Sequence, residues 1–171
     1  METPPQTSTP RPKFQNNKSR FKKREPKNKT RNFKRTGKRK NKKIGEVQKS
    51  TIVTMFLEIL TMIKLYHWKT KSYAEHKTTD ELYASLSEKF DKFVEVLLGK
   101  DESRINLINN KIQALEYNDK SGFKKQMHEY RAFFVDMERF FDEDGDSDLL
   151  SIRDEILADI NQFLYLITFD K

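Results

Sequence analysis

The feature that most constrains the fold of this chain is the helical spacing of its apolar residues after residue 50. Two segments, about 122–141 and about 147–169, carry apolar residues at steps of three and four, which places them on one face of an α-helix. They are Phe123, Met127, Tyr130, Phe134, Met137 and Phe141, then Leu149, Ile152, Ile156, Ile160, Phe163 and Ile167. The sequence contains no strand-like alternation of comparable length. It therefore predicts an all-α domain.

Two earlier segments complete a set of four predicted helices. The first spans about 50–70, and the second spans about 76–98 and ends at Gly99. The first has an apolar stripe, but its other sides are also largely apolar, which is more than one core face requires. Those additional residues are Met55, Leu57, Ile59, Met62 and Leu65. Such a helix indicates a subunit interface in a small bundle.

The connections between the predicted helices indicate a topology. The first and second helices, and the third and fourth, are joined by short segments, so each pair is antiparallel. The long connection between Gly99 and Gly122 allows a crossover along the bundle, and its apolar residues predict a short packed helix. These residues are Ile105, Leu107, Ile108, Ile112 and Leu115. Residues 46–171 are therefore predicted to form a ferritin-like four-helix bundle.

The first 45 residues have a very different composition. They carry 17 Lys or Arg and two acidic residues, a net charge of +15, whereas residues 46–171 have a net charge of −7. All five prolines lie in this tail, and its few large apolar groups bury too little surface to offset chain entropy. The tail is predicted to be disordered when free.

The charge of the tail favours a nucleic-acid partner over a role in solubility or localisation alone. Phosphate contacts need only positive charge, and phenylalanines beside basic residues can stack on exposed bases. The choice between DNA and RNA stays open. The candidate contact residues are Arg11, Lys13, Lys18, Arg20, Lys22, Lys23, Arg24, Lys34, Arg35, Lys38, Arg39, Lys40, Lys42 and Lys43.

Several classes of protein are excluded or not expected. The absence of cysteine excludes disulfides, thiolate metal sites and cysteine nucleophiles. No apolar stretch follows the first charges of the chain, so no secretory signal is expected. The longest apolar-rich run, 52–68, is interrupted by Glu58 and Lys64, which argues against a membrane span. We expect a cytoplasmic protein, in a host cell or a virion if the source is viral.

Five residues form the main candidate for chemistry, namely His67, His76, Asp80, Asp91 and Glu95. The last four recur at steps of four, eleven and four, along one side of the second predicted helix. The simpler alternative is a solvated charged face. Asp80 and Asp91 are about 16 Å apart along a helix, too far to bind one metal ion together. A two-fold partner with an antiparallel second helix could bring the two ends together, so the spacing predicts an intersubunit metal site or none.

This pattern resembles that of Dps proteins, the DNA-binding mini-ferritins. The matching residues are the pair His67-Trp68, then His76-x3-Asp80 and Asp91-x3-Glu95. The resemblance implies that His67, His76 and Asp80 of one subunit bind iron for oxidation together with Asp91 and Glu95 of its partner. It also implies a dodecameric shell. His67 and His76 are closer in sequence than in Dps proteins, so the loop between them is shorter here.

The chain also resembles an uncharacterised family from giant DNA viruses with the same His-Trp, His, Asp and Glu layout. Three functions are open. The first is a Dps-like protein that binds DNA and binds or oxidises iron. The second is a nucleic-acid-binding architectural or virion protein that keeps the bundle without iron turnover. The third is a helical adaptor whose tail binds RNA or an acidic protein.

The acidic segment 142–148 is the remaining candidate site. A solvated turn is the preferred interpretation, because its acids also favour the N-terminus of the next helix. The resemblance to ferritin-like shells offers cation entry instead, through Asp142, Asp144, Asp146 and Asp148. The third histidine, His128, has no ligand-type neighbour at helical spacing and is expected at a surface or an edge.

Overall fold

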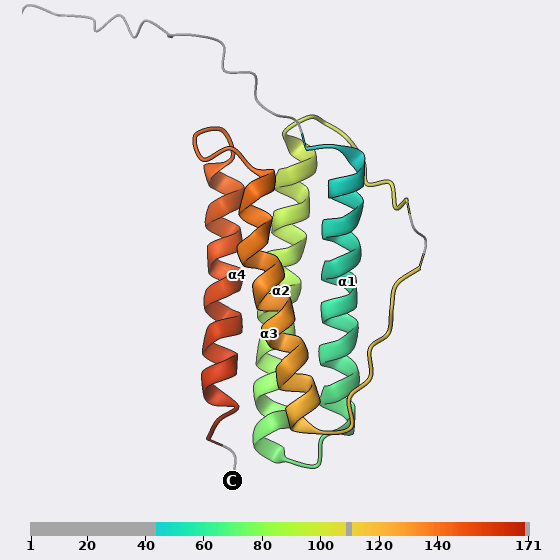
Figure 1. Cartoon of the computed structure of the whole chain (residues 1–171), viewed down its shortest axis with the longest axis vertical. Helices are drawn as coiled ribbons and strands as arrows, with labels where there is room; N and C mark the ends of the chain where they lie inside the picture. The colour runs from blue at the N-terminus through green and yellow to red at the C-terminus, as the bar shows by residue number, and fades with distance from the viewer. Residues whose placement is uncertain (1–43, 109–110, 170–171) are drawn as a thin grey trace, which may run out of the picture. The chain divides into compact units, whose positions relative to one another are not determined.

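A computed structural model describes residues 44–108 and 111–169, and within them the protein consists of four α-helices with no strand (Figure 1). The helices are α1 (Glu46–Lys69), α2 (Tyr73–Gly99), α3 (Lys120–Asp136) and α4 (Ser147–Leu166). A short 3-10 helix, η1 (Met137–Phe140), follows α3. The prediction of an all-α domain built on four helices is confirmed.

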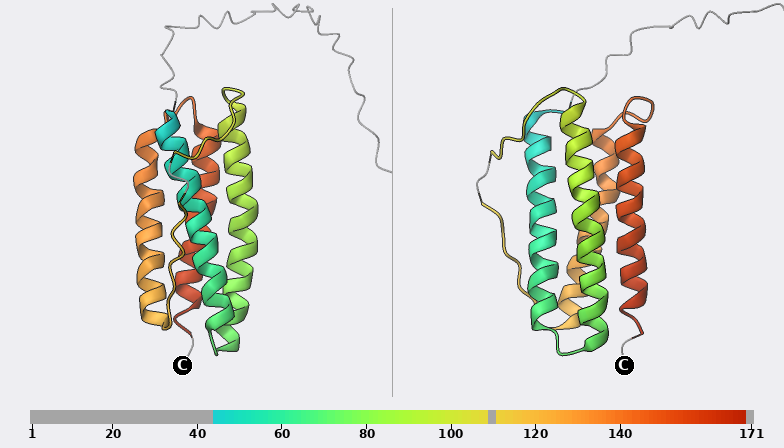
Figure 2. Two further views of the ribbon diagram at one scale, coloured as in Figure 1. Left: turned by 90° about the vertical axis from the view of Figure 1, so that its right-hand side faces the viewer. Right: turned by 180° about the vertical axis from the view of Figure 1, so that it is seen from behind.

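The helices run side by side along one long axis. α1 and α2 are antiparallel, and the connection after α2 returns along α1 to the far end, so α2 and α3 run in the same direction (Figures 1 and 2). α4 then runs opposite to α3. α2 packs against both α1 and α4, and α3 packs mainly against α4.

The prediction of a short helix within the long connection is wrong. Residues 103–108 and 111–117 have no helical structure. Side chains of α1 accept hydrogen bonds from their backbone instead. The backbone N–H of Ile108 donates to Ser50 Oγ at 3.0 Å, and that of Gln113 donates to Glu58 Oε1 at 3.0 Å. Of the apolar residues that suggested the helix, only Leu115 packs against the core.

Capping residues explain why two helices begin earlier than their apolar stripes. The Ser72 side chain accepts a hydrogen bond from the backbone N–H of Glu75 at 3.3 Å, so α2 begins at Tyr73. Asp119 accepts from the backbone N–H of Gly122 at 2.8 Å, so α3 begins at Lys120. α3 ends at Asp136 and α4 at Leu166, both short of the predicted ends.

Aromatic stacking joins three helices at the centre of the core. Phe56 of α1 stacks on Phe90 of α2 with ring centroids 4.1 Å apart, and Phe134 of α3 lies 5.7 Å from Phe56 and 5.9 Å from Phe90. All three rings are buried. Aromatic pairs of this kind contribute about 1 kcal/mol each beyond the burial of their surface, so this cluster helps to fix the register of α1 against α2.

The predicted tail lies outside the described residues except at its end. Ile44 packs partly against the core, and Gly45 is the N-cap of α1. Among the described residues, the packed body therefore includes Ile44 and Gly45, which the sequence assigned to the tail. Within the described residues no helix is both long enough and apolar enough to cross a lipid bilayer.

Candidate metal site

The turn between α1 and α2 brings two candidate ligands together. His67 lies in the last turn of α1 and His76 in the first turns of α2, and their rings stack with centroids 3.8 Å apart and planes 24° apart. His67 is buried and His76 is exposed. The short turn therefore brings the His67 ring beside that of His76.

Backbone hydrogen bonds orient both imidazole rings. His67 Nδ1 lies 3.0 Å from the carbonyl oxygen of His76, and His76 Nδ1 lies 3.1 Å from the carbonyl oxygen of His67. A carbonyl oxygen can only accept, so each Nδ1 carries the hydrogen, and in the neutral ring each Nε2 keeps its lone pair. Metal-binding histidines are commonly held in this way, because the Nδ1–H bond fixes the tautomer and the ring orientation.

A buried carboxylate fixes the turn that carries the two histidines. Glu75 accepts hydrogen bonds from Tyr66 Oη at 2.7 Å and from Thr70 Oγ1 at 2.5 Å. Burial and the neighbouring Glu75 carboxylate raise the pKa of Tyr66 well above its usual value, so its hydroxyl stays protonated and donates. Glu75 was not predicted as part of the site, since only the structure shows that this acidic residue is buried.

Asp80 is the third candidate ligand at this end of the bundle. Its Oδ1 lies 3.8 Å from His67 Nε2 and 3.5 Å from the ammonium of Lys64. The Lys64 ammonium also lies 4.8 Å from the centroid of the Tyr83 ring. Lys64 was missed in the sequence, although its position three residues before His67 places it on the same side of α1.

The other two candidates, Asp91 and Glu95, lie on exposed positions farther along α2. In residues 44–108 and 111–169 of a single chain, no three His, Cys, Asp or Glu side chains are placed to hold a metal ion. One chain thus brings His67 close to His76 and, separately, to Asp80, without arranging the three as a metal site. Asp91 and Glu95 lie apart from them on α2.

An apolar groove lies between α1 and α2, with a volume of about 640 Å³. We call it the α1–α2 groove; its lining includes Val53, Leu57, Leu60, Tyr83, Ala84, Ser87, Asp91 and Val94. The sequence predicted that α1 has more apolar surface than the core requires. Leu57 is half-buried and leaves such apolar surface outside the core. Ile59 and Met62, in contrast, are fully buried in the core.

The side of α2 that carries the candidate ligands has a symmetric order. It reads His76, Asp80, Ala84, Ser87, Asp91 and Glu95, at steps of four, four, three, four and four. The order has its centre between residues 85 and 86, with small residues next to the centre and ligand-type residues at both ends. The two small residues also line the α1–α2 groove.

The acidic segment 142–148 has its own counter-cation. The Lys100 ammonium lies 3.0 Å from Asp146 and 2.9 Å from Asp148, and it donates to the carbonyl oxygen of Gly145 at 2.7 Å. The backbone N–H of Asp142 donates to Asp146 Oδ2 at 3.0 Å. These contacts stabilise the segment as a turn. The role of this segment in cation entry stays a prediction.

The third histidine, His128, is exposed on α3, as its sequence context predicted.

Comparison with known proteins places the chain in a family. Residues 67–167, more than half of the chain, match the family described as "Family of unknown function (DUF5856)". The chain belongs to this family. The matched range begins at His67 and includes all five candidate ligands, whereas the basic tail and most of α1 lie outside it. Comparisons with curated proteins and with solved structures gave no significant match.

Proposed function

We propose that this member of the family is a Dps-like protein: a ferritin-like bundle that pairs through α1 and α2, binds Fe(II) between subunits and oxidises it, and binds nucleic acid through its basic tail. The observation that carries the proposal is the reciprocal hydrogen bonding of His67 and His76. It leaves the Nε2 atom of each histidine without a backbone partner, and His67 Nε2 lies 3.8 Å from the Asp80 carboxylate.

The symmetric order along α2 supports the pairing. In a two-fold dimer with antiparallel α2 helices, the axis would cross α2 between residues 85 and 86. Ala84 and Ser87 would then flank the axis, where their small side chains permit close approach. His76 and Asp80 of one subunit would then lie opposite Asp91 and Glu95 of its partner. The two-fold axis would form this arrangement twice in each dimer.

The α1–α2 groove supports the same face of the bundle as the subunit interface. Its half-buried apolar residues Val53, Leu57 and Leu60 gain from leaving water, and the groove extends along α2 from Tyr83 to Val94, which includes the position of the axis. Each completed site would offer two imidazole nitrogens and three carboxylates, a donor set suited to iron. Fe(II) is the substrate in this proposal, and it loses an electron to an oxidant that occupies an open coordination position.

The tail supplies the nucleic-acid binding in this proposal. Residues 46–171 have a net charge of −7 and repel phosphates, so affinity must come from the net charge of +15 in residues 1–45. A chain that lacks residues 1–43 keeps Ile44 and the N-cap Gly45. It is expected to fold and to lose DNA binding at physiological salt. DNA binding by this truncated chain would overturn this part of the proposal.

One observation favours the alternative, a nucleic-acid-binding architectural protein without iron turnover. The Lys64 ammonium lies 3.5 Å from Asp80, where it already supplies a positive charge to this carboxylate. A bundle stabilised in that way does not require a metal ion.

Anaerobic titration with Fe(II), followed by exposure to an oxidant, separates the two functions. The Dps-like proposal predicts saturable binding of at least about one Fe(II) per subunit. The variants Asp91→Ala and Glu95→Ala should each lose this binding. The absence of saturable binding in the wild-type protein would remove the ferroxidase proposal and leave the architectural one. The mass in solution tests assembly, since a monomer cannot complete the site.

A further inference from the structure

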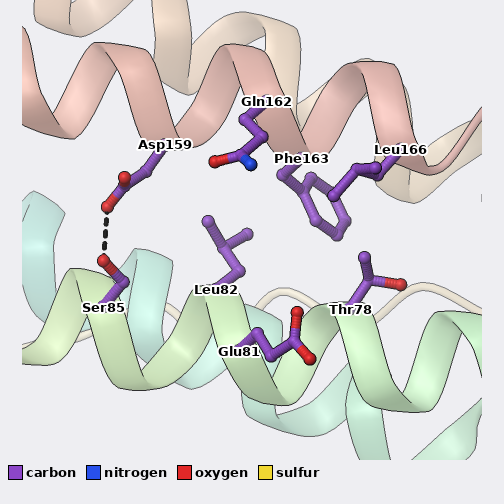
Figure 3. Close-up of a pocket in the computed structure, with 8 residues that line it drawn as sticks. All are labelled: Thr78, Glu81, Leu82, Ser85, Asp159, Gln162, Phe163 and Leu166. Atoms are coloured by element: carbon purple, nitrogen blue, oxygen red, sulfur yellow. Dashed lines mark hydrogen bonds between the residues drawn. The ribbon is translucent and has the colours of Figure 1, made fainter.

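A second hollow in the bundle lies between α2 and α4 and is unrelated to the candidate metal ligands. It has a volume of about 190 Å³, and we call it the α2–α4 pocket (Figure 3). Its α2 lining includes Glu81, Leu82 and Ser85, which by helical rotation face away from Asp80 and Asp91. The pocket is complete within one chain, so it does not depend on the proposed dimer.

One end of the pocket is closed by a polar cluster whose charges balance. The Ser85 hydroxyl donates to Asp159 Oδ2 at 2.6 Å, as drawn in Figure 3. The Lys89 ammonium donates to Ser85 Oγ at 2.8 Å and forms a salt bridge with the same Asp159 oxygen. Because Lys89 neutralises Asp159, this end offers hydrogen-bonding groups but no net charge.

The floor of the pocket is apolar. Leu82 of α2 and Phe163 of α4 are both buried, and Leu166 forms a more exposed wall beside them (Figure 3). Small-molecule sites are commonly built in this way, with apolar walls and a few polar groups that fix orientation. The floor can therefore receive the apolar body of a small molecule.

Glu81 gives the pocket a net negative charge. It is an exposed residue of α2 on the opposite wall from Gln162 of α4 (Figure 3). Among the residues that the structure describes, Glu81 has no cationic partner, unlike Asp159. This uncompensated negative charge repels anions and attracts a ligand with a single positive charge. It neither attracts nor repels a neutral molecule.

We propose that the α2–α4 pocket binds a primary ammonium group that carries a small apolar body. The ammonium lies between the Glu81 carboxylate and the side-chain carbonyl oxygen of Gln162. The apolar body covers Leu82 and Phe163 and approaches the Ser85–Asp159 end.

Three probes of similar shape and different charge test this proposal. Benzylamine is protonated at neutral pH, benzyl alcohol is neutral and benzoate is anionic. Binding to the full chain is measured by NMR chemical-shift titration, with the Gln162 side-chain amide and the Leu82 and Leu166 methyl groups as reporters. Benzylamine is expected to bind about fivefold more tightly than benzyl alcohol, the size of one partly exposed charge interaction. Benzoate is expected to bind most weakly.

The variant Glu81→Gln isolates the charge. It is expected to remove the preference for benzylamine over benzyl alcohol and to leave the affinity for benzyl alcohol unchanged. The matched control is Glu155→Gln, an exposed acid of α4 outside the pocket lining, which should keep the preference. Equal affinity for the three probes, shifts that do not involve the reporters, or an equal effect of both variants would overturn the proposal.

Discussion

His67 and His76 each have their Nδ1 within 3.1 Å of the other residue's backbone carbonyl oxygen, and their rings stack with centroids 3.8 Å apart. The pair is held by the backbone at the junction of α1 and α2, so its geometry does not depend on a bound metal. Both Nε2 atoms remain available as acceptors. This arrangement is the basis of the first prediction.

Replacement of either histidine is expected to weaken metal binding. His67→Ala and His76→Ala each remove one nitrogen ligand and should lower the affinity for Fe(II) at least about tenfold, since even the loss of an outer hydrogen-bond partner costs that much at metal sites. Anaerobic calorimetric titration measures the change. His128→Ala, at an exposed position of α3, serves as the control and should bind as the wild type does. Equal losses in all three variants would count against the assignment.

The symmetric order along α2 predicts that a large residue at its centre blocks pairing. Ala84 is exposed in the single chain, so Ala84→Arg should fold normally, but its side chain would lie at the proposed axis. We expect a shift to monomer in analytical ultracentrifugation and the loss of saturable Fe(II) binding. Ala132→Arg makes the same change at an exposed position of α3 and should keep the wild-type mass. A wild-type mass for Ala84→Arg would exclude this face as the interface.

Lys64 is predicted to compete with the metal ion. Its ammonium lies 3.5 Å from Asp80, so a bound cation must share or displace that contact. Lys64→Met keeps much of the apolar stem and removes the charge, and it should raise the affinity for Fe(II) about fivefold, the scale of a partly exposed ion pair. Lys125→Met, on exposed α3, is the control. Unchanged or weaker binding in Lys64→Met would show that Lys64 does not oppose the metal.

The pH dependence of stability is predicted from a contact at the other end of α1. Lys49 is buried and donates to Asp101 at 2.8 Å and to Ser103 at 2.7 Å. The hydrogen bond that Lys49 donates to Asp101, together with hydrogen bonds from Ser103 to the same carboxylate, lowers the pKa of Asp101 to about 2. A carboxyl group with a lowered pKa in the folded state stabilises the fold above its unfolded pKa, near 4, and loses that contribution as the pH falls through its folded pKa.

Asp101→Asn should therefore lower the urea midpoint at neutral pH. The difference from wild type should shrink as the pH falls from about 4 to about 2. Glu155→Gln changes an exposed acid that has no such contact within residues 44–108 and 111–169, and it should follow the wild type throughout. A difference for Asp101→Asn that does not change with pH would mean that the ionised carboxylate is not the stabilising group.

The helices could be predicted from the sequence because their stabilisation is periodic. The stripes from Phe123 to Met137 and from Leu149 to Ile167 are buried in the structure. The ends of the helices were less accurate, because side chains such as Ser72 and Asp119 cap the first turns ahead of the apolar stripes.

Contacts between residues far apart in sequence could not be predicted. Neither the long connection that binds to Ser50 and Glu58 nor the pairing of Lys49 with Asp101 follows a local spacing rule. The candidate ligands were proposed from helical spacing along the second helix and from the resemblance to Dps proteins. The structure adds the hydrogen bonds that orient His67 and His76, and it adds Lys64 beside Asp80.

In the proposed dimer, each metal site takes His67, His76 and Asp80 from one subunit and Asp91 and Glu95 from its partner. His76→Ala and Glu95→Ala each remove a ligand from every site of their own dimers. A mixed dimer of the two variants concentrates both changes in one site and leaves the other intact.

The most direct measurement is therefore the Fe(II) stoichiometry of mixed dimers, purified with two different affinity tags. We predict that each variant alone shows no strong site and that the mixed dimer recovers one, half the number in the wild-type dimer. If mixed dimers form and recover no strong site, the ligands are not shared between subunits in this way.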